Sequence, residues 1–146
     1  MEITTKPLYD TDFALWADHT AELIRAGRLD EVDLENVAEE IASLGRSERR
    51  AVRSQLKRML LHRIKQQIQS DRGGASWETS VNDARQEILD ALEDSPSLRP
   101  HLEGNLEKIY RMAVELALIE TGVESADLPE RCPFTLDQLL QPKEPW

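Results

Sequence analysis

The sequence predicts an all-α protein: a compact bundle of about five helices with a Pro-rich C-terminal arm. Apolar residues recur at spacings of three and four in successive segments, as expected for helices with one buried face. No segment combines two-residue alternation with the turn residues of a β-hairpin. The length of 146 residues corresponds to about one domain. We therefore expect a single domain over 1–146, with arms at 1–9 and 123–146.

The first two helices are predicted over residues 10–27 and 34–44. Asp10 or Thr11 can cap the first helix and Gly27 can end it, whereas Asp33 can cap the second helix and Gly45 can end it. The expected buried faces are Phe13, Trp16, Ala17, Thr20, Leu23 and Ile24 in the first helix, and Leu34, Val37, Ala38, Ile41 and Leu44 in the second.

Ser47 offers a fresh cap for a third, longer helix that ends by Gly73–Gly74. Ser76 can cap a fourth helix, in which Trp77 is expected to be a core residue and which stops at Ser95–Pro96. The apolar faces of these helices are Val52, Leu56, Met59, Leu60, Ile64 and Ile68, and then Val81, Ala84, Ile88, Leu89 and Leu92.

The fifth helix is predicted from Ser97 to Gly122, with a long apolar face. After it the chain contains four prolines, which leave room for at most one short helix, capped by Thr135. The apolar face of the fifth helix is Leu98, Leu102, Leu106, Ile109, Tyr110, Ala113 and Ala117, and the short helix carries Leu136, Leu139 and Leu140.

Charge and hydropathy argue against a membrane or a polyanion as the general partner. The net charge is −10, which repels nucleic acid and anionic lipid. The longest apolar run, Phe13–Ala17, has five residues, far below the roughly 20 that span a bilayer. The first ten residues lack the apolar core of a secretion signal. We expect a cytoplasmic protein, and its single cysteine fits that location.

Several short motifs occur in one order along nearly the whole chain. They are YDTDF at 9–13, EEIASLGRSE at 39–48, LLH at 60–62, SPSL at 95–98 and CPF at 132–134. With these motifs the chain resembles the domain-of-unknown-function 29 family of bacterial proteins. The resemblance implies one α-helical domain and supplies neither an activity nor catalytic residues. The chain departs from the family pattern at Arg63 and Gln66, where Leu and Trp are expected.

No compact catalytic or metal-binding motif is present. Helical zinc and di-iron sites use His-Glu-x-x-His or repeated Glu-x-x-His, and neither pattern occurs. A site would have to be assembled across helices, and solvated or capping side chains are the simpler interpretation of the candidates, so no cofactor is expected. Gly73–Gly74 lacks the lysine and strand of a phosphate-binding loop and is interpreted as a helix connection. The candidates are His19, His62 and His101 with Glu39 and Glu40.

Two residues are candidates for a chemical role on their own. His62 lies close to the apolar face of the third helix, and a histidine there is either a hydrogen-bonded core residue or part of a site with carboxylates. Cys132 follows Arg131, whose charge would lower the thiol pKa, but no cysteine-protease motif accompanies it. We interpret Cys132 as a packing residue and keep His62 as the candidate site residue.

The strongest electrostatic feature is basic. The segment from Arg46 to Arg72 contains nine basic and two acidic residues. Its net charge is +7, which leaves −17 on the rest of the chain. Four of the nine lie on one helical face and form the candidate interaction surface. This surface could track phosphates, or it could meet acidic rows on the second helix (Glu35, Glu39 and Glu40) or the fourth helix, within the molecule or across a dimer. A salt-bridged or solvated face is the favoured interpretation, ahead of a protein partner and of nucleic acid. The four residues are Arg46, Arg50, Arg53 and Lys57.

The sequence therefore favours a non-enzymatic helical protein-interaction domain with an acidic protein partner. A small enzyme or metal protein around His62 is the alternative, and nucleic-acid binding through Arg46–Lys65 is a weaker one, because no aromatics interleave with the basic row. A weak homodimer is also expected, since a small bundle leaves apolar surface uncovered. That surface is expected near Arg63 and Gln66 and in the tail, at Leu136, Leu139, Leu140 and Trp146.

Overall fold

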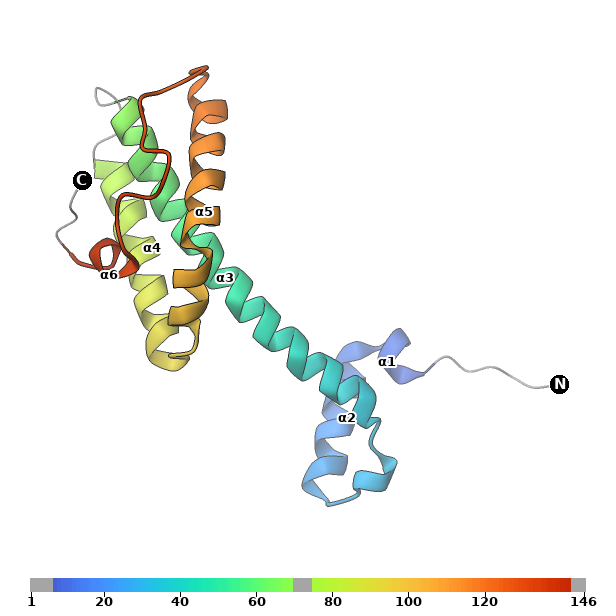
Figure 1. Ribbon diagram of the computed structural model, residues 1–146. Helices are drawn as coiled ribbons and strands as arrows, with labels where there is room; N and C mark the ends of the chain where they lie inside the picture. The colour runs from blue at the N-terminus through green and yellow to red at the C-terminus, as the bar shows by residue number, and fades with distance from the viewer. Residues whose placement is uncertain (1–6, 70–74, 143–146) are drawn as a thin grey trace. The chain divides into compact units, whose positions relative to one another are not determined.

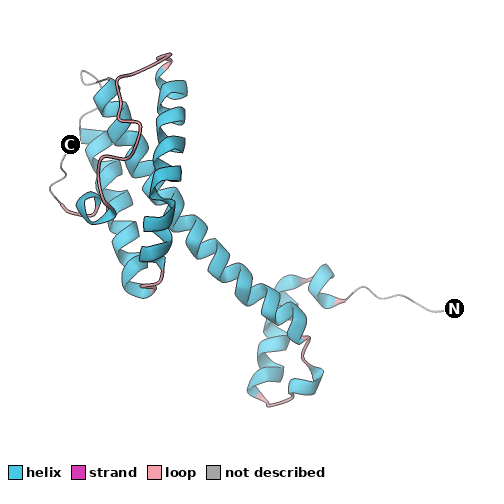
Figure 2. Ribbon diagram, viewed as in Figure 1, coloured by secondary structure: helices cyan, strands magenta, loops and turns pink. Residues whose placement is uncertain are grey.

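The computed structural model describes residues 7–69 and 75–142, and within these ranges the protein consists of helices and loops without a strand (Figure 2). This confirms the all-α prediction. No helix in these ranges is both long enough and apolar enough to cross a bilayer. In chain order the elements are α1 (Leu8–Thr11), α2 (Phe13–Arg25), the 3₁₀ helix η1 (Leu29–Glu31), α3 (Leu34–Ile68), α4 (Ala75–Asp94), α5 (Leu98–Thr121) and α6 (Leu136–Leu139) (Figure 1).

The chain divides into two compact units, residues 1–46 and 47–146. The N-terminal unit contains α1, α2, η1 and the first part of α3. Asp12, not the predicted Asp10 or Thr11, caps α2, because its carboxylate accepts a hydrogen bond from the Leu15 amide at 3.1 Å. The rings of Tyr9 and Trp16 meet edge to face with centroids 4.8 Å apart. Tyr9 also donates a hydrogen bond to Glu40, which joins α1 to α3.

Helix α3 is continuous, so the predicted break at Gly45 and fresh cap at Ser47 are wrong. A glycine inside a helix costs only about 1 kcal/mol relative to alanine, and serine costs less. Strong helix formers follow Gly45, and they outweigh that cost. The predicted N-terminal cap of α3 is confirmed, because the Asp33 carboxylate accepts a hydrogen bond from the Asn36 amide at 3.2 Å.

The C-terminal unit holds the hydrophobic core, formed by the rest of α3 with α4, α5 and α6. The predicted apolar faces of the third, fourth and fifth helices are confirmed in large part, although Leu89 is exposed and Trp77 is only half-buried. The side chains with less than 2 % exposure include Leu56, Met59, Leu60, Ile64, Ile88 and Leu102.

The C-terminal segment packs onto this core. Thr135 caps α6 in a capping box with Gln138, as the sequence predicts for the cap. The guanidinium of Arg85 donates to the Leu139 carbonyl oxygen at 3.3 Å, and the Tyr110 hydroxyl donates to the Pro129 carbonyl oxygen at 2.6 Å.

α4 begins at Ala75, so the predicted cap Ser76 lies inside the helix. α5 ends at Gly122, whose φ of 73° places it in the left-handed region that favours glycine.

Candidate functional site

A groove between α3 and α5 in the C-terminal unit collects four cationic side chains. Its volume is about 420 Å³, within the range of ligand pockets. Three of the cations are members of the predicted row on α3, and the fourth comes from α5. Ile109 and Met112 supply an apolar part of the lining. We call this the cationic groove; its lining is Arg50, Arg53, Ser54, Lys57, Asn105, Lys108, Ile109 and Met112.

The four cations of the groove have no carboxylate partner in the part of the chain that the structure describes. Among the described residues, Arg50, Arg53, Lys57 and Lys108 form no ion pair within 4.0 Å. Like charges on adjacent turns repel one another, and the attraction of a bound anion would offset that repulsion. The groove is therefore suited to an anionic ligand.

One contact orients the groove. A guanidinium nitrogen of Arg53 lies 2.9 Å from Nε2 of His101 on α5. Arginine only donates, so His101 accepts with Nε2 and is neutral, with its proton on Nδ1. Burial is the main cause that lowers the pKa of His101, and the charges of Arg53 and Arg49 lower it further. The contact holds Arg53 at the groove without using its charge.

Arg46 and Lys108 show what the helical row alone could not predict. Arg46 belongs to the N-terminal unit and pairs with Glu39 of the same helix at 2.6 Å, so it takes no part in the groove. Lys108 was missed because it lies on another helix, where no basic row draws attention to it. Its spacing of three from Asn105 and four from Met112 is the signal that could have shown it facing α3.

The basic row meets an acidic row of the chain at Arg46 and Glu39, whereas the described groove residues form no ion pair within 4.0 Å. The described ion pairs that join α3 to other helices of the C-terminal unit use cations outside the groove. Arg63 reaches Glu78 of α4 at 3.2 Å, and Lys65 reaches Glu120 of α5 at 2.9 Å. These pairs lie nearer the end of α3, where charges of both signs meet.

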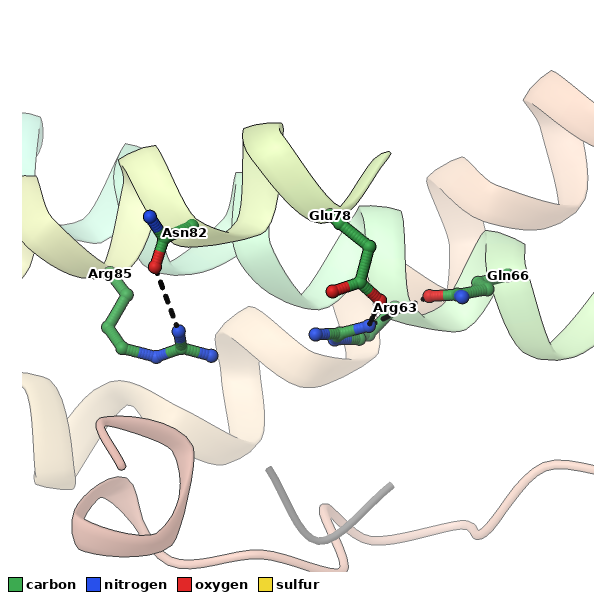
Figure 3. A network of polar contacts seen from close by, with 5 residues as sticks. All are labelled: Arg63, Gln66, Glu78, Asn82 and Arg85. Atoms are coloured by element: carbon green, nitrogen blue, oxygen red, sulfur yellow. Dashed lines mark hydrogen bonds and ion pairs between the residues drawn. The ribbon is translucent and has the colours of Figure 1, made fainter. Parts of the chain in front are cut away.

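The departures from the family pattern do not create an apolar surface. Arg63 donates to Gln66 at 2.8 Å and also contacts Glu78, so both departures are used in a polar network (Figure 3). The tail does not create one either, since its three described leucines are buried in the core: Leu136, Leu139 and Leu140. Trp146 lies outside the described residues. Among the described residues, these positions therefore supply no exposed apolar surface for a dimer.

His62, the candidate site residue, is partly buried on α3. Its Nδ1 is buried without a hydrogen-bond partner in the described residues. The pKa of His62 is lowered, mainly because the imidazole is buried. The charges of Lys65 and Arg58 lower it further, and the charge of Glu120 acts in the opposite direction. The expected hydrogen bond to a carboxylate or carbonyl is thus not seen.

Cys132 behaves as a packing residue. Burial raises its thiol pKa, and the sulfur lies 3.4 Å from the Phe134 carbonyl oxygen. The raised pKa is opposite to the lowering that the neighbouring charge of Arg131 suggested. The Cys132 amide donates to Glu107 at 3.1 Å, which ties the tail to α5.

The remaining candidates are not brought together. Across the described ranges no three His, Cys, Asp or Glu side chains are close enough to hold a metal ion. His19 is exposed on α2, Glu39 pairs with Arg46, and Glu40 accepts from Tyr9. Gly73–Gly74 lies outside the described residues.

A second groove, between α3 and α4, has the opposite charge. It is lined by the acidic side chains Glu48, Glu87, Asp90 and Asp94, together with Ala51, Val52, Gln55 and Ala91. α3 therefore carries a cationic groove on its α5 side and an acidic groove on its α4 side. An acidic ligand is attracted to the first groove and repelled by the second, which fixes where it can bind.

Comparisons with known proteins agree with this fold. The family model described as domain of unknown function DUF29 matches residues 8–143. The chain is similar to an α-helical protein of unknown function from Rhodospirillum rubrum, known from a crystal structure, at 27 % identity and a TM-score of 0.63. The match covers 97 % of this chain and 92 % of that one. No curated protein matches the chain. The family match spans nearly the whole sequence, so the chain belongs to the DUF29 family.

Proposed function

We propose that the protein is a non-enzymatic interaction domain whose cationic groove binds an acidic segment of a partner protein. The observation that carries the proposal is the set of four cations around one groove, without carboxylate partners in the described structure, in a chain of net charge −10. A chain with this excess of acid could neutralise the four cations internally, yet they remain available. Charge complementarity gives such a surface its specificity and its association rate.

The lining favours a peptide segment over a bare phosphate backbone. Ile109 and Met112 add apolar contacts, and Ser54 and Asn105 add hydrogen-bonding groups. A helical segment that presents acidic and apolar side chains on one face would contact the cations, the apolar side chains and the hydrogen-bonding groups of the groove. Nucleic acid would use the cations alone, because no aromatic side chain lines the groove to stack a base.

A labelled synthetic peptide, rich in Glu and Leu and helical in isolation, tests the proposal by fluorescence anisotropy with the full chain. We expect binding that weakens as salt is added, because screening acts on exposed charges. Changing Arg50→Glu together with Arg53→Glu should weaken it by at least about tenfold, the effect of losing roughly 1.4 kcal/mol.

Arg111 and Arg131 provide the matched control. Both are exposed in the C-terminal unit and neither lines the groove. Changing Arg111→Glu together with Arg131→Glu alters the net charge equally, and should weaken binding by less than about threefold if the groove is the site. Equal losses in the two double variants would refute a defined site. Binding of mixed DNA or RNA at low salt, abolished only by the groove variant, would instead indicate nucleic-acid recognition.

A further inference from the structure

The first part of α3 carries large apolar side chains that the N-terminal unit leaves exposed. Leu34, Ile41 and Leu44 are 61 %, 63 % and 68 % exposed. The sequence predicts the opposite, because it assigns them to a buried face. The half-buried side chains on this part of α3 are mostly polar: Asn36, Glu40 and Ser43, with Val37 at the border.

The spacing of this face is that of a coiled-coil seam. Leu34, Val37, Ile41 and Leu44 follow one another at intervals of three, four and three residues, over less than two heptads. This set is defined here as the α3 seam. The intervals of the seam read the same from either end of the helix. In an antiparallel pair about a two-fold axis, Leu34 would face Leu44 of the second copy and Val37 would face Ile41, as an isologous interface requires.

The amount of apolar surface fits a weak interface rather than a permanent one. Between residues 7 and 46 seven large apolar side chains are more than 40 % exposed: Phe13, Leu15, Ile24, Leu29, Leu34, Ile41 and Leu44. At about 100 Å² for a fully buried side chain of this size, the three on the seam offer roughly 200 Å² per copy, and the four on α2 and η1 offer roughly 200 Å² more. Weak complexes bury less than about 1,200 Å² in total, and obligate dimers bury more than about 2,000 Å².

We propose that two copies of the chain pair antiparallel along the α3 seam and form a weak homodimer. Small side chains beside the seam, Ala38 and Ala42, together with Gly45, permit the close approach of two helices. Pairing along the α3 seam does not require the cationic groove, because the seam lies in the other unit.

The charge of the N-terminal unit sets the sign of the salt effect. Residues 1–46 contain eleven acidic and four basic side chains, a net of −7. Two such units repel each other, so added salt screens the repulsion and should strengthen pairing through apolar contacts. Binding of an acidic segment at the cationic groove should weaken under the same conditions. The two interactions are thus distinguished by opposite responses to salt.

Sedimentation equilibrium of the full chain, at several salt concentrations, tests the pairing. We expect Ile41→Glu to raise the dimer dissociation constant by at least about tenfold, because it places a charge at the centre of the seam. The matched control is Ile119→Glu, since Ile119 has the same side chain, is 69 % exposed and lies in the C-terminal unit. It should change the constant by less than about twofold. Circular dichroism verifies that both variants are folded.

Cysteine cross-linking tests the orientation. In a Cys132→Ala background, a mixture of Leu34→Cys and Leu44→Cys chains should form mainly mixed disulfides between the two variants, as antiparallel pairing requires. Mainly like-with-like disulfides would overturn the antiparallel arrangement.

Two further outcomes would overturn the pairing itself: a strict monomer at millimolar concentration, or equal weakening by Ile41→Glu and Ile119→Glu. The acidic peptide should still bind Ile41→Glu in either event, so failure of the seam is separable from failure of the groove.

Discussion

The two units of this chain are built from similar helices but bury very different amounts of apolar surface. In the described part of the N-terminal unit only Thr20 and Leu23 are buried, and seven large apolar side chains are exposed. The C-terminal unit buries a continuous core and, over its described ranges 47–69 and 75–142, exposes three: Leu89, Met112 and Ile119. A helix periodicity therefore shows that a face is apolar but does not show what covers it. The N-terminal unit presents the apolar face, and the C-terminal unit presents the charged groove.

The largest expected difference between the units is the cost of truncating a buried leucine. Leu60 is fully buried in the core, so Leu60→Ala should lower the free energy of unfolding by about 2–5 kcal/mol. Leu23→Ala, in a unit that can collapse around the change, should cost less than about 2 kcal/mol. Urea unfolding monitored by circular dichroism measures both. Equal losses would show that the N-terminal unit is packed as tightly as the core.

Amide hydrogen exchange should differ between the units by at least about 100-fold, or roughly 2.7 kcal/mol of local opening free energy. α3 provides an internal comparison, because one continuous helix belongs to both units. We expect amides before Arg46 to exchange faster than those from Val52 to Ile64, whose side chains reach the core. Uniform protection along α3 would contradict the comparison.

The sequence predicted local features well and long-range ones less well. The caps Asp33 and Thr135 and the stop at Gly122 were predicted because each depends on a few adjacent residues. The continuity of α3 through Gly45 was not predicted, because a single glycine has a small cost that its neighbours can outweigh.

The candidate site divides in the same way. The row of Arg50, Arg53 and Lys57 follows from helical spacing alone. Lys108 and His101 enter only because α5 packs against α3 at that level. The availability of the four cations also could not be predicted, since it depends on which carboxylates the packing keeps away.

Stability should fall as the pH drops below about 6.5, the ordinary pKa of histidine. Burial lowers the pKa of both His62 and His101 in the folded protein. The unfolded chain therefore binds protons first, and the free energy of unfolding decreases with decreasing pH until the folded histidines also titrate. Urea unfolding across this range measures the effect. The double variant His62→Gln with His101→Asn should show a shallower dependence, and an unchanged slope would contradict the assignment.

The smallest expected effect concerns the groove. Two interpretations of the basic row make opposite predictions for Arg50→Glu combined with Arg53→Glu. If the row faced acidic helices across a partly desolvated seam, the double change would cost clearly more than about 2 kcal/mol of unfolding free energy. The described structure contains no such ion pairs, and exposed charges contribute only about 0–1 kcal/mol each.

Reversing two of four like charges also relieves their mutual repulsion, which offsets the lost contact between Arg53 and His101. We therefore expect the unfolding free energy to change by less than about 1 kcal/mol, measured by urea unfolding at low salt. A small change in stability together with a large loss of peptide binding would show that these cations are kept for a ligand rather than for the fold.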